Sequence, residues 1–246
     1  MSLSKNQISI LSGNALKFIA AAAMVCDHVG VILFPNVLFL RVIGRLAFPI
    51  FAFMISEGAK HTRNKLRYLL TMAGFALVIQ AGYFIYSRSL EMSVMVTFTL
   101  SLCAILALDL FKRALFRDDL PQKLLTGALF VSVIIAISMI DKLVDLDYGF
   151  AGCMLPVFAS LFVAPKDCPC ETMRRLDCMP IRVLTTAVGL LLLAAGSNGI
   201  QYWSFLSLPL LLLYSEKRGK LKTKYFFYIF YPLHLVILEC ASLLIG

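Results

Sequence analysis

The chain has 246 residues, of which 60% are hydrophobic and 15% are charged, against about 45–50% and about 25% in a soluble globular domain. Its mean hydropathy is +0.86, and apolar runs long enough to cross about 30 Å of hydrocarbon recur along it. This composition excludes a mainly soluble protein. The sequence therefore predicts an all-α, polytopic integral membrane bundle that forms a single domain over residues 1–246.

The apolar runs predict about nine transmembrane helices. In chain order they cover roughly residues 15–35, 37–59, 66–87, 93–111, 123–140, 148–164, 181–197, 202–214 and 225–245. The sixth and eighth spans are short, so they could be tilted, re-entrant or merged with a neighbour. We expect the first span to be retained, because no small-residue cleavage site follows it.

The polar loops between these spans alternate in charge. Loops after the second, fourth, sixth and eighth spans hold most of the lysines and arginines, whereas the others are short and neutral or acidic. The positive-inside rule then predicts that the amino terminus and the basic loops lie in the cytoplasm. The net charge of +9 is thus explained by topology and lipid contact, and it does not indicate a nucleic-acid partner.

The chain contains seven cysteines, three of which share one polar loop: Cys168, Cys170 and Cys178. Their C-x-C-x7-C spacing lacks the paired C-x2-C halves of a common zinc site. The odd total also argues against a disulfide framework. We expect free thiols here and no metal.

Charged residues inside the first two spans are the most informative feature of the sequence. Asp27 and His28 lie in the first span and Arg45 in the second, where each buried charge costs several kcal/mol unless it is paired or hydrated. The two spans are antiparallel around a Pro35-Asn36 turn. His28 and Arg45 lie at similar distances from this turn, so we expect them at the same depth.

Two arrangements of this group are open. Asp27 could pair with Arg45 while His28 faces a cavity, or it could orient the imidazole of His28 through water. A purely structural alternative is an Asp27–Arg45 pair that pins the helices, with His28 as an interhelical hydrogen-bond partner. Pro49 should kink the second span, and Arg41 should reach toward the outer surface.

The cytoplasmic end of the second span combines acidic, imidazole and basic groups. Glu57 and His61 are four residues apart and could pair on one helix face. A basic collar lies beside them and consists of Lys60, Arg63, Lys65 and Arg67. Such a collar is commonly a topology signal that contacts lipid phosphates. It could instead attract a phosphorylated cytosolic donor, since arginine binds phosphate in a bidentate manner.

Two further polar groups lie outside the first two spans. His234 is near the middle of the last span with Tyr231 one turn earlier. They form either a polar cluster facing the bundle interior or a polar packing contact. At the outer end of the fifth span, Asp147 and Tyr148 could bind an acceptor amine, although exposed acids need no such role. A proton-accepting histidine, a buried ion pair and the basic collar are compatible with acyl transfer from a coenzyme A thioester. They are also compatible with a proton-coupled carrier.

Three segments carry a family resemblance. LKFIAAAAMVCDHVG, IGRLAFPIFAFMISEGAKHTRNKLRYL and FYIFYPLHLVIL are similar to the TraX family, which includes proteins associated with N-terminal acetylation of conjugative pilin. The similarity runs from about Asn14 to Arg67, recurs weakly at VTFTL and LDYG, and returns in the last span. More distantly, Lys17 and His28 have the basic-x10-His spacing that resembles the first helix of acyltransferase-3 type enzymes, whose histidine is the proposed catalytic residue.

The resemblance implies transfer of an acyl group, expected to be acetyl, from cytosolic acyl-CoA to an amine or hydroxyl at the outer side of a bacterial inner membrane. His28 would act as general base or acyl carrier, oriented by Asp27 and Arg45, with Lys17 in the same catalytic group. The expected substrate-binding residues are Glu57, Lys60, His61, Arg63, Arg67, Tyr231 and His234. The expected partners are acetyl-CoA, membrane lipids and an acceptor protein, glycan or lipid, such as a pilin amino terminus.

Two alternatives to an enzyme stay open at this point. One is a proton-coupled membrane transporter. The other is a membrane assembly protein without chemistry of its own.

Overall fold

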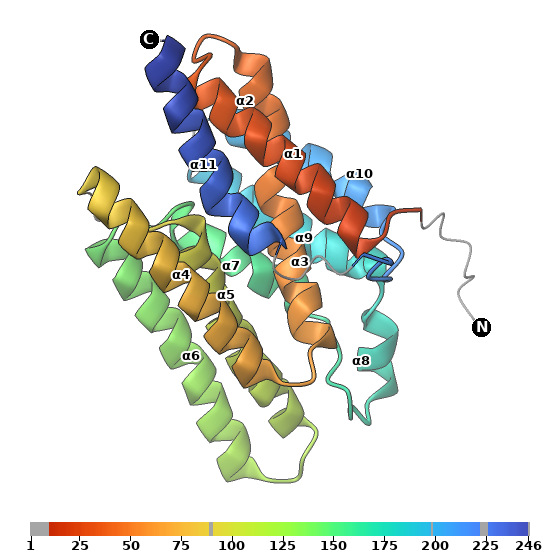
Figure 1. Ribbon diagram of the computed structural model, residues 1–246. Coiled ribbons are helices and arrows are strands. Elements are labelled where there is room, and N and C mark those ends of the chain that lie inside the picture. Colours follow the sequence, from red (N-terminus) through yellow and green to blue (C-terminus); the bar gives the residue numbers. More distant parts are fainter. Residues whose placement is uncertain (1–9, 89–90, 198, 222–225, 246) are drawn as a thin grey trace. The chain divides into compact units, whose positions relative to one another are not determined.

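The computed structural model of the protein describes residues 10–88, 91–197, 199–221 and 226–245, and these form helices joined by short loops (Figure 1). In chain order they are α1 Gly13–Ile32, α2 Leu38–Gly44, α3 Ala47–His61, α4 Lys65–Ser87, α5 Val94–Leu115, α6 Leu120–Leu143, α7 Gly149–Ser160, α8 Glu171–Leu176, α9 Met179–Ala195, the 3-10 helix η1 Gly199–Leu206, α10 Ser207–Leu212 and α11 Phe226–Ile245. Extended pairing within these ranges is limited to two isolated bridges. The all-α fold is therefore confirmed.

Among the described residues, six helical segments are long and apolar enough to cross a membrane. They are Gly13–Ile32, Leu38–His61, Lys65–Ile85, Val94–Leu115, Leu120–Leu143 and Phe226–Leu244. The spans expected at 148–164, 181–197 and 202–214 correspond to apolar helices of only 10–17 residues. At about 1.5 Å per residue such helices are shorter than about 30 Å of hydrocarbon. The membrane-protein class is confirmed, whereas the count of nine spans is not.

The contacts of the chain group into two compact units. The terminal unit consists of Met1–Met54 and Ser197–Gly246, and the central unit consists of Ile55–Gly196. Helix α3 begins in the terminal unit and ends in the central unit. The single domain expected over residues 1–246 stays a prediction.

In the terminal unit, α1 packs closely against α2. Helix α1 begins after Ser12, whose side chain accepts a hydrogen bond from the Ala15 amide at 3.2 Å. A Cβ at Gly30 would lie 2.9 Å from Leu40 Cβ, and one at Gly44 would overlap the side chain of Asp27. These glycines let the two backbones approach, as small residues do in membrane helix pairs.

A break in the second expected span positions Arg45. Helix α2 ends at Gly44 and α3 starts at Ala47, so Arg45 lies between them. Pro49 has no amide hydrogen, and its ring clashes with the carbonyl four residues earlier, which belongs to Arg45. The predicted interruption is therefore present, but it falls one turn before Pro49 and leaves Arg45 where the helix is discontinuous.

In the central unit, α7 contacts both α5 and α9. Its core includes Leu102, Leu155 and Leu190, each with no exposed surface. At Gly189 an added Cβ would lie 2.9 Å from the side chain of Leu155. Gly189 thus allows the close packing of α9 on the short helix α7.

Candidate active site

Asp27 is the centre of an ion-pair cluster in the terminal unit. Arg45 Nη2 lies 2.6 Å from both carboxylate oxygens of Asp27, and Arg41 Nε lies 3.0 Å from Oδ1. The Asp27 and Arg45 side chains are 15% and 10% exposed, so these are mostly buried, charge-assisted contacts. The Asp27–Arg45 pair is observed, and it is common to the first of the two arrangements and to the purely structural alternative. A cavity that His28 faces stays a prediction. Arg41, expected to reach toward the outer surface, also contacts Asp27.

Gln201 extends this cluster. Arg45 Nη1 donates a hydrogen bond of 3.2 Å to Gln201 Oε1, and Gln201, which lies in η1, is buried. The Gln201 Nε2 group is buried as well and has no hydrogen-bond partner within the described ranges. Sequence reasoning did not single out this residue, because a glutamine beside a Ser-Asn-Gly turn looks like an ordinary loop residue.

His28 contacts a second histidine from the other end of the chain. His28 Nδ1 and His234 Nε2 are 2.9 Å apart, and His234 Nδ1 is 3.0 Å from the carbonyl oxygen of Phe230. A carbonyl oxygen only accepts hydrogen bonds, so the neutral His234 ring carries its proton on Nδ1. Its Nε2 then accepts from His28 Nδ1–H. In this arrangement the lone pair of His28 resides on Nε2.

Aromatic residues of α11 fix the ring of His234. The Phe230 ring stacks on it at 5.3 Å between centroids with an interplanar angle of 12°. The Tyr231 ring contacts it at 5.8 Å and 61°. His234 is buried, and its hydrogen-bond partner is His28. This contact fits both a polar cluster and a polar packing contact.

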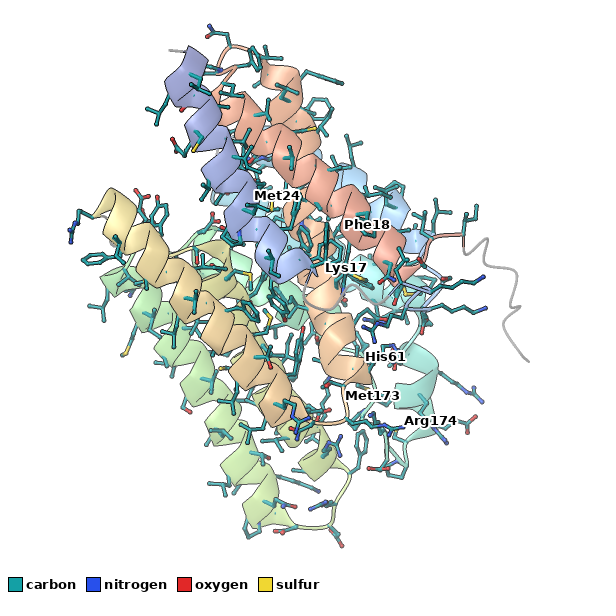
Figure 2. All side chains as sticks on the ribbon, in the orientation of Figure 1. Lys17, Phe18, Met24, His61, Met173 and Arg174 are labelled. Carbon is teal, nitrogen blue, oxygen red and sulfur yellow. The ribbon has the colours of Figure 1, made fainter. Side chains whose placement is uncertain are left out.

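The structure does not bring Lys17 to this histidine pair. Lys17 lies three turns before His28 on α1 (Figure 2), which separates them by about 16 Å along the axis. Its ammonium lies 6.0 Å from the centroid of the Phe227 ring, and the neighbouring Phe18 packs against the same ring. A catalytic role for Lys17 stays a prediction.

The central unit contains a separate buried ion pair. Glu57 Oε1 lies 2.6 Å from Arg182 Nη1, and Glu57 Oε2 lies 3.3 Å from His61 Nε2 on the next turn of α3. Arg182 has no exposed surface. The Glu57–His61 pairing was expected, whereas the sequence analysis did not identify Arg182, which lies in the first turn of α9, as a partner of Glu57. Its signal was the one that identified Asp27, a charge at the edge of an apolar run.

The basic collar is divided by the structure. Lys60 Nζ contacts Asp177 Oδ1 at 3.0 Å, and Lys65 contacts Asp109. Arg63 and Arg67 are exposed. His61 is half exposed at the C-terminal end of α3 (Figure 2). Arg174, a cation outside the basic collar, is on α8 (Figure 2).

Asp147 and Tyr148 form a turn at the start of α7. Tyr148 has a φ of 64°, in the left-handed region. The Asp147 carbonyl accepts a hydrogen bond of 2.8 Å from the Thr97 hydroxyl, and the Asp147 amide donates to the Met92 carbonyl at 3.1 Å. The backbone of this turn is therefore fixed while the Asp147 side chain is exposed. Its contact with an acceptor stays a prediction.

Known proteins resemble the chain over most of its length. A family model described as "TraX protein" matches residues 12–242. The chain is 28% identical over 256 residues to "Probable fimbrial assembly protein FimC, serogroup H1" of Dichelobacter nodosus, which covers 93% of this chain and 94% of that protein. It is 26% identical over 135 residues to an uncharacterized protein of Rickettsia prowazekii, covering 54% of this chain and 49% of that protein. No solved structure matches.

These matches confirm the resemblance to TraX, while the more distant likeness to acyltransferase-3 enzymes stays a prediction. The family match covers almost all of the described residues, including both histidines of the pair and the Asp27 cluster. The chain belongs to the TraX family.

Proposed function

We propose that this protein is a membrane acyltransferase that moves an acetyl group from cytosolic acetyl-CoA to an amine or hydroxyl at the outer side of a bacterial inner membrane. The observation that carries the proposal is the hydrogen-bonded chain from the Phe230 carbonyl through His234 to His28. It leaves a basic nitrogen on His28 whose tautomer is set by the protein. Such a nitrogen is the usual requirement for a general base in acyl transfer.

His28 acts in this proposal at Nε2. It accepts the proton that the acceptor amine or hydroxyl loses as its nitrogen or oxygen attacks the thioester carbonyl carbon. As the C–S bond breaks, His28 returns this proton to the departing sulfur. The Nδ1–H of His28 stays donated to His234 throughout, and this hydrogen bond keeps the ring orientation constant.

The Asp27 cluster supplies positive charge in this mechanism. Two guanidinium groups contact one carboxylate, so the cluster next to His28 in sequence has a net positive charge. Gln201 Nε2 adds a buried donor without a partner among the residues that the structure describes. We assign Gln201 and Arg45 to stabilise the negative oxygen that develops on the attacked carbonyl.

Family membership and the named relative support a protein acceptor. Some TraX proteins are associated with acetylation of a pilin amino terminus, and the Dichelobacter nodosus relative is named as a fimbrial assembly protein. We therefore propose the amino terminus of a pilin subunit as the first acceptor to test. The same relative's name also favours a second candidate function, assembly of fimbriae without catalysis.

The experiment uses purified protein in lipid nanodiscs with radiolabelled acetyl-CoA and a synthetic pilin amino-terminal peptide, a glycan or an aminolipid. The variant is His28→Ala, and the matched control on the same helix is Val31→Ala, whose side chain is exposed. We expect label transfer by the wild type and the control, and a loss of about 100-fold or more in His28→Ala. Peptide binding without label transfer to any acceptor would favour assembly and reject the enzyme.

A further inference from the structure

A basic pocket lies in the central unit. Its lining includes five cationic side chains from the ends of three helices, α3, α4 and α5, and from the loop after α7: Lys60, Lys65, Lys112, Arg113 and Lys166. Asp109 is the one carboxylate in this lining, and the hydroxyls of Ser56 and Ser160 complete its polar part. We call this site the α5 pocket.

Lys112 is the informative residue of the α5 pocket. It is 7% exposed, and Nζ donates to the carbonyl oxygens of Ser160 at 2.6 Å and Val163 at 3.1 Å. These carbonyls follow the end of α7, so two of the three ammonium hydrogens cap that helix. None of the described carboxylates forms an ion pair with Lys112. A buried ammonium without a direct ion pair is costly, and a third hydrogen is left for a ligand.

The other cations leave a positive excess. Asp109 contacts both Lys65 and, at 2.8 Å, Arg113. From outside the lining, Asp177 contacts Lys60 at 3.0 Å, and the exposed Asp167 lies 3.7 Å from Arg113. With these two acids counted, the five cations still outnumber the carboxylates that contact them. The pocket is therefore suited to an anion that carries more than one charge.

We propose that the α5 pocket binds the phosphate groups of a phosphorylated ligand, with Lys112 at its base and Lys166 at its rim. Lysine and arginine donors on mobile side chains match phosphate oxygens in number and charge. The lining lies at the ends of α3, α5 and α7 and at the start of α4, which the positive-inside rule places in the cytoplasm. The source of these phosphate groups is taken from the proposed function, on which the inference rests in this respect. The phosphates are then those of the coenzyme A moiety of the acyl donor.

This pocket differs from the basic collar that the sequence predicted as the binding site of a phosphorylated donor. Lys60 and Lys65 belong to both the collar and the pocket, whereas the exposed Arg63 and Arg67 do not line the pocket. Lys112 and Arg113 lie at the end of an apolar span, where they look like residues of an ordinary basic loop. The fold brings them to Lys60 and Lys65.

The test is equilibrium binding of tritiated coenzyme A to the full chain in phosphatidylcholine nanodiscs, with pyrophosphate as competitor. The variants are Lys166→Glu, whose exposed side chain donates a hydrogen bond of 3.4 Å to the Thr62 carbonyl, and Lys112→Gln. The matched control is Arg174→Glu, an equally exposed cation on α8 outside the lining. We expect both pocket variants to weaken binding about tenfold or more, competition by pyrophosphate, and a change of less than about twofold in the control.

A second arm distinguishes the source of the phosphate. Replacing part of the phosphatidylcholine by phosphatidylglycerol should leave coenzyme A binding intact if the donor is the ligand. Competition by phosphatidylglycerol that disappears in Lys166→Glu would keep the phosphate site and assign it to lipid.

Two results with the variants would contradict the proposed phosphate site. One is coenzyme A binding that neither Lys166→Glu nor Lys112→Gln weakens, and the other is an equal loss of binding in Arg174→Glu. No binding of either phosphate source by the wild type would overturn it as well. Turnover is measured separately. Coenzyme A binding that depends on the pocket residues, without acetyl transfer, would therefore contradict the proposed function but support the phosphate-binding site.

Discussion

His28 and His234 are separated by 206 residues in the chain, yet their ring nitrogens Nδ1 and Nε2 lie 2.9 Å apart. The contact joins the first described helix to the last one and passes through a ring whose other nitrogen is fixed by the Phe230 carbonyl. Because each neutral imidazole has one donor and one acceptor, the direction of this chain determines which nitrogen of His28 is basic. The contact therefore has a chemical consequence as well as a packing role.

Asp27 should contribute more to stability than either arginine that contacts it. Asp27→Asn leaves two guanidinium groups without a counter-charge and should lower the free energy of unfolding by about 2–3 kcal/mol. Arg45→Met should lower the free energy of unfolding by less, because Asp27 then still has Arg41 as an ion-pair partner at 3.0 Å. Chemical unfolding in detergent measures both variants. Equal losses, or a larger loss in Arg45→Met, would contradict this cluster.

The approach of α1 to α2 at Gly44 can be tested with alanine. A Cβ at Gly44 would overlap Asp27, whereas a Cβ at Gly74 in α4 would meet nothing within 4 Å. Gly44→Ala should therefore cost about 1–3 kcal/mol through overpacking. Gly74→Ala should be neutral or stabilising by up to about 1 kcal/mol, since alanine favours helix. Thermal unfolding of the two variants checks this, and similar shifts in both would show that Gly44 is not closely packed.

The Glu57–Arg182 pair should show strong energetic coupling. Arg182→Met leaves the buried carboxylate of Glu57 with His61 at 3.3 Å and should lower the free energy of unfolding by about 3–5 kcal/mol. The double variant Glu57→Gln with Arg182→Met removes both charges and should lose less than the sum of the single variants. A double-mutant cycle by urea unfolding measures the coupling. Strict additivity would mean that the two side chains do not interact.

The sequence predicts some features of this site directly and others not at all. Charges within apolar spans, together with the antiparallel turn at Pro35-Asn36, predict the Asp27–Arg45 contact because helix rise fixes depth. Depth alone does not select the neighbour of a helix, so the partner of His28 was not predictable from one sequence. Spacing likewise grouped Lys17 with His28, although three helical turns separate them.

The span count shows a related limit. Hydropathy reports how apolar a segment is, and it does not report where the helix ends. Helix α7 covers 12 residues because it ends at Ser160, whose carbonyl accepts a hydrogen bond from the Lys112 ammonium, before the end of the span expected at 148–164. Arg182 illustrates the same limit, because its position before an apolar run is shared by buried and exposed arginines. Only the packing of α9 in the central unit shows that it is buried.

In the proposed mechanism, His234 accepts a hydrogen bond from His28 and thereby determines which nitrogen of His28 is basic. The most direct measurement compares acetyl transfer by His234→Gln and His234→Leu in the same nanodisc assay, with Cys240→Ala, an exposed residue of α11, as control. The glutamine carbonyl oxygen replaces the acceptor at Nε2, whereas leucine has a similar size and no acceptor. We predict that the glutamine variant keeps at least about tenfold more kcat than the leucine variant, with both equally folded by thermal unfolding. Equal kcat in the two variants would contradict the claim.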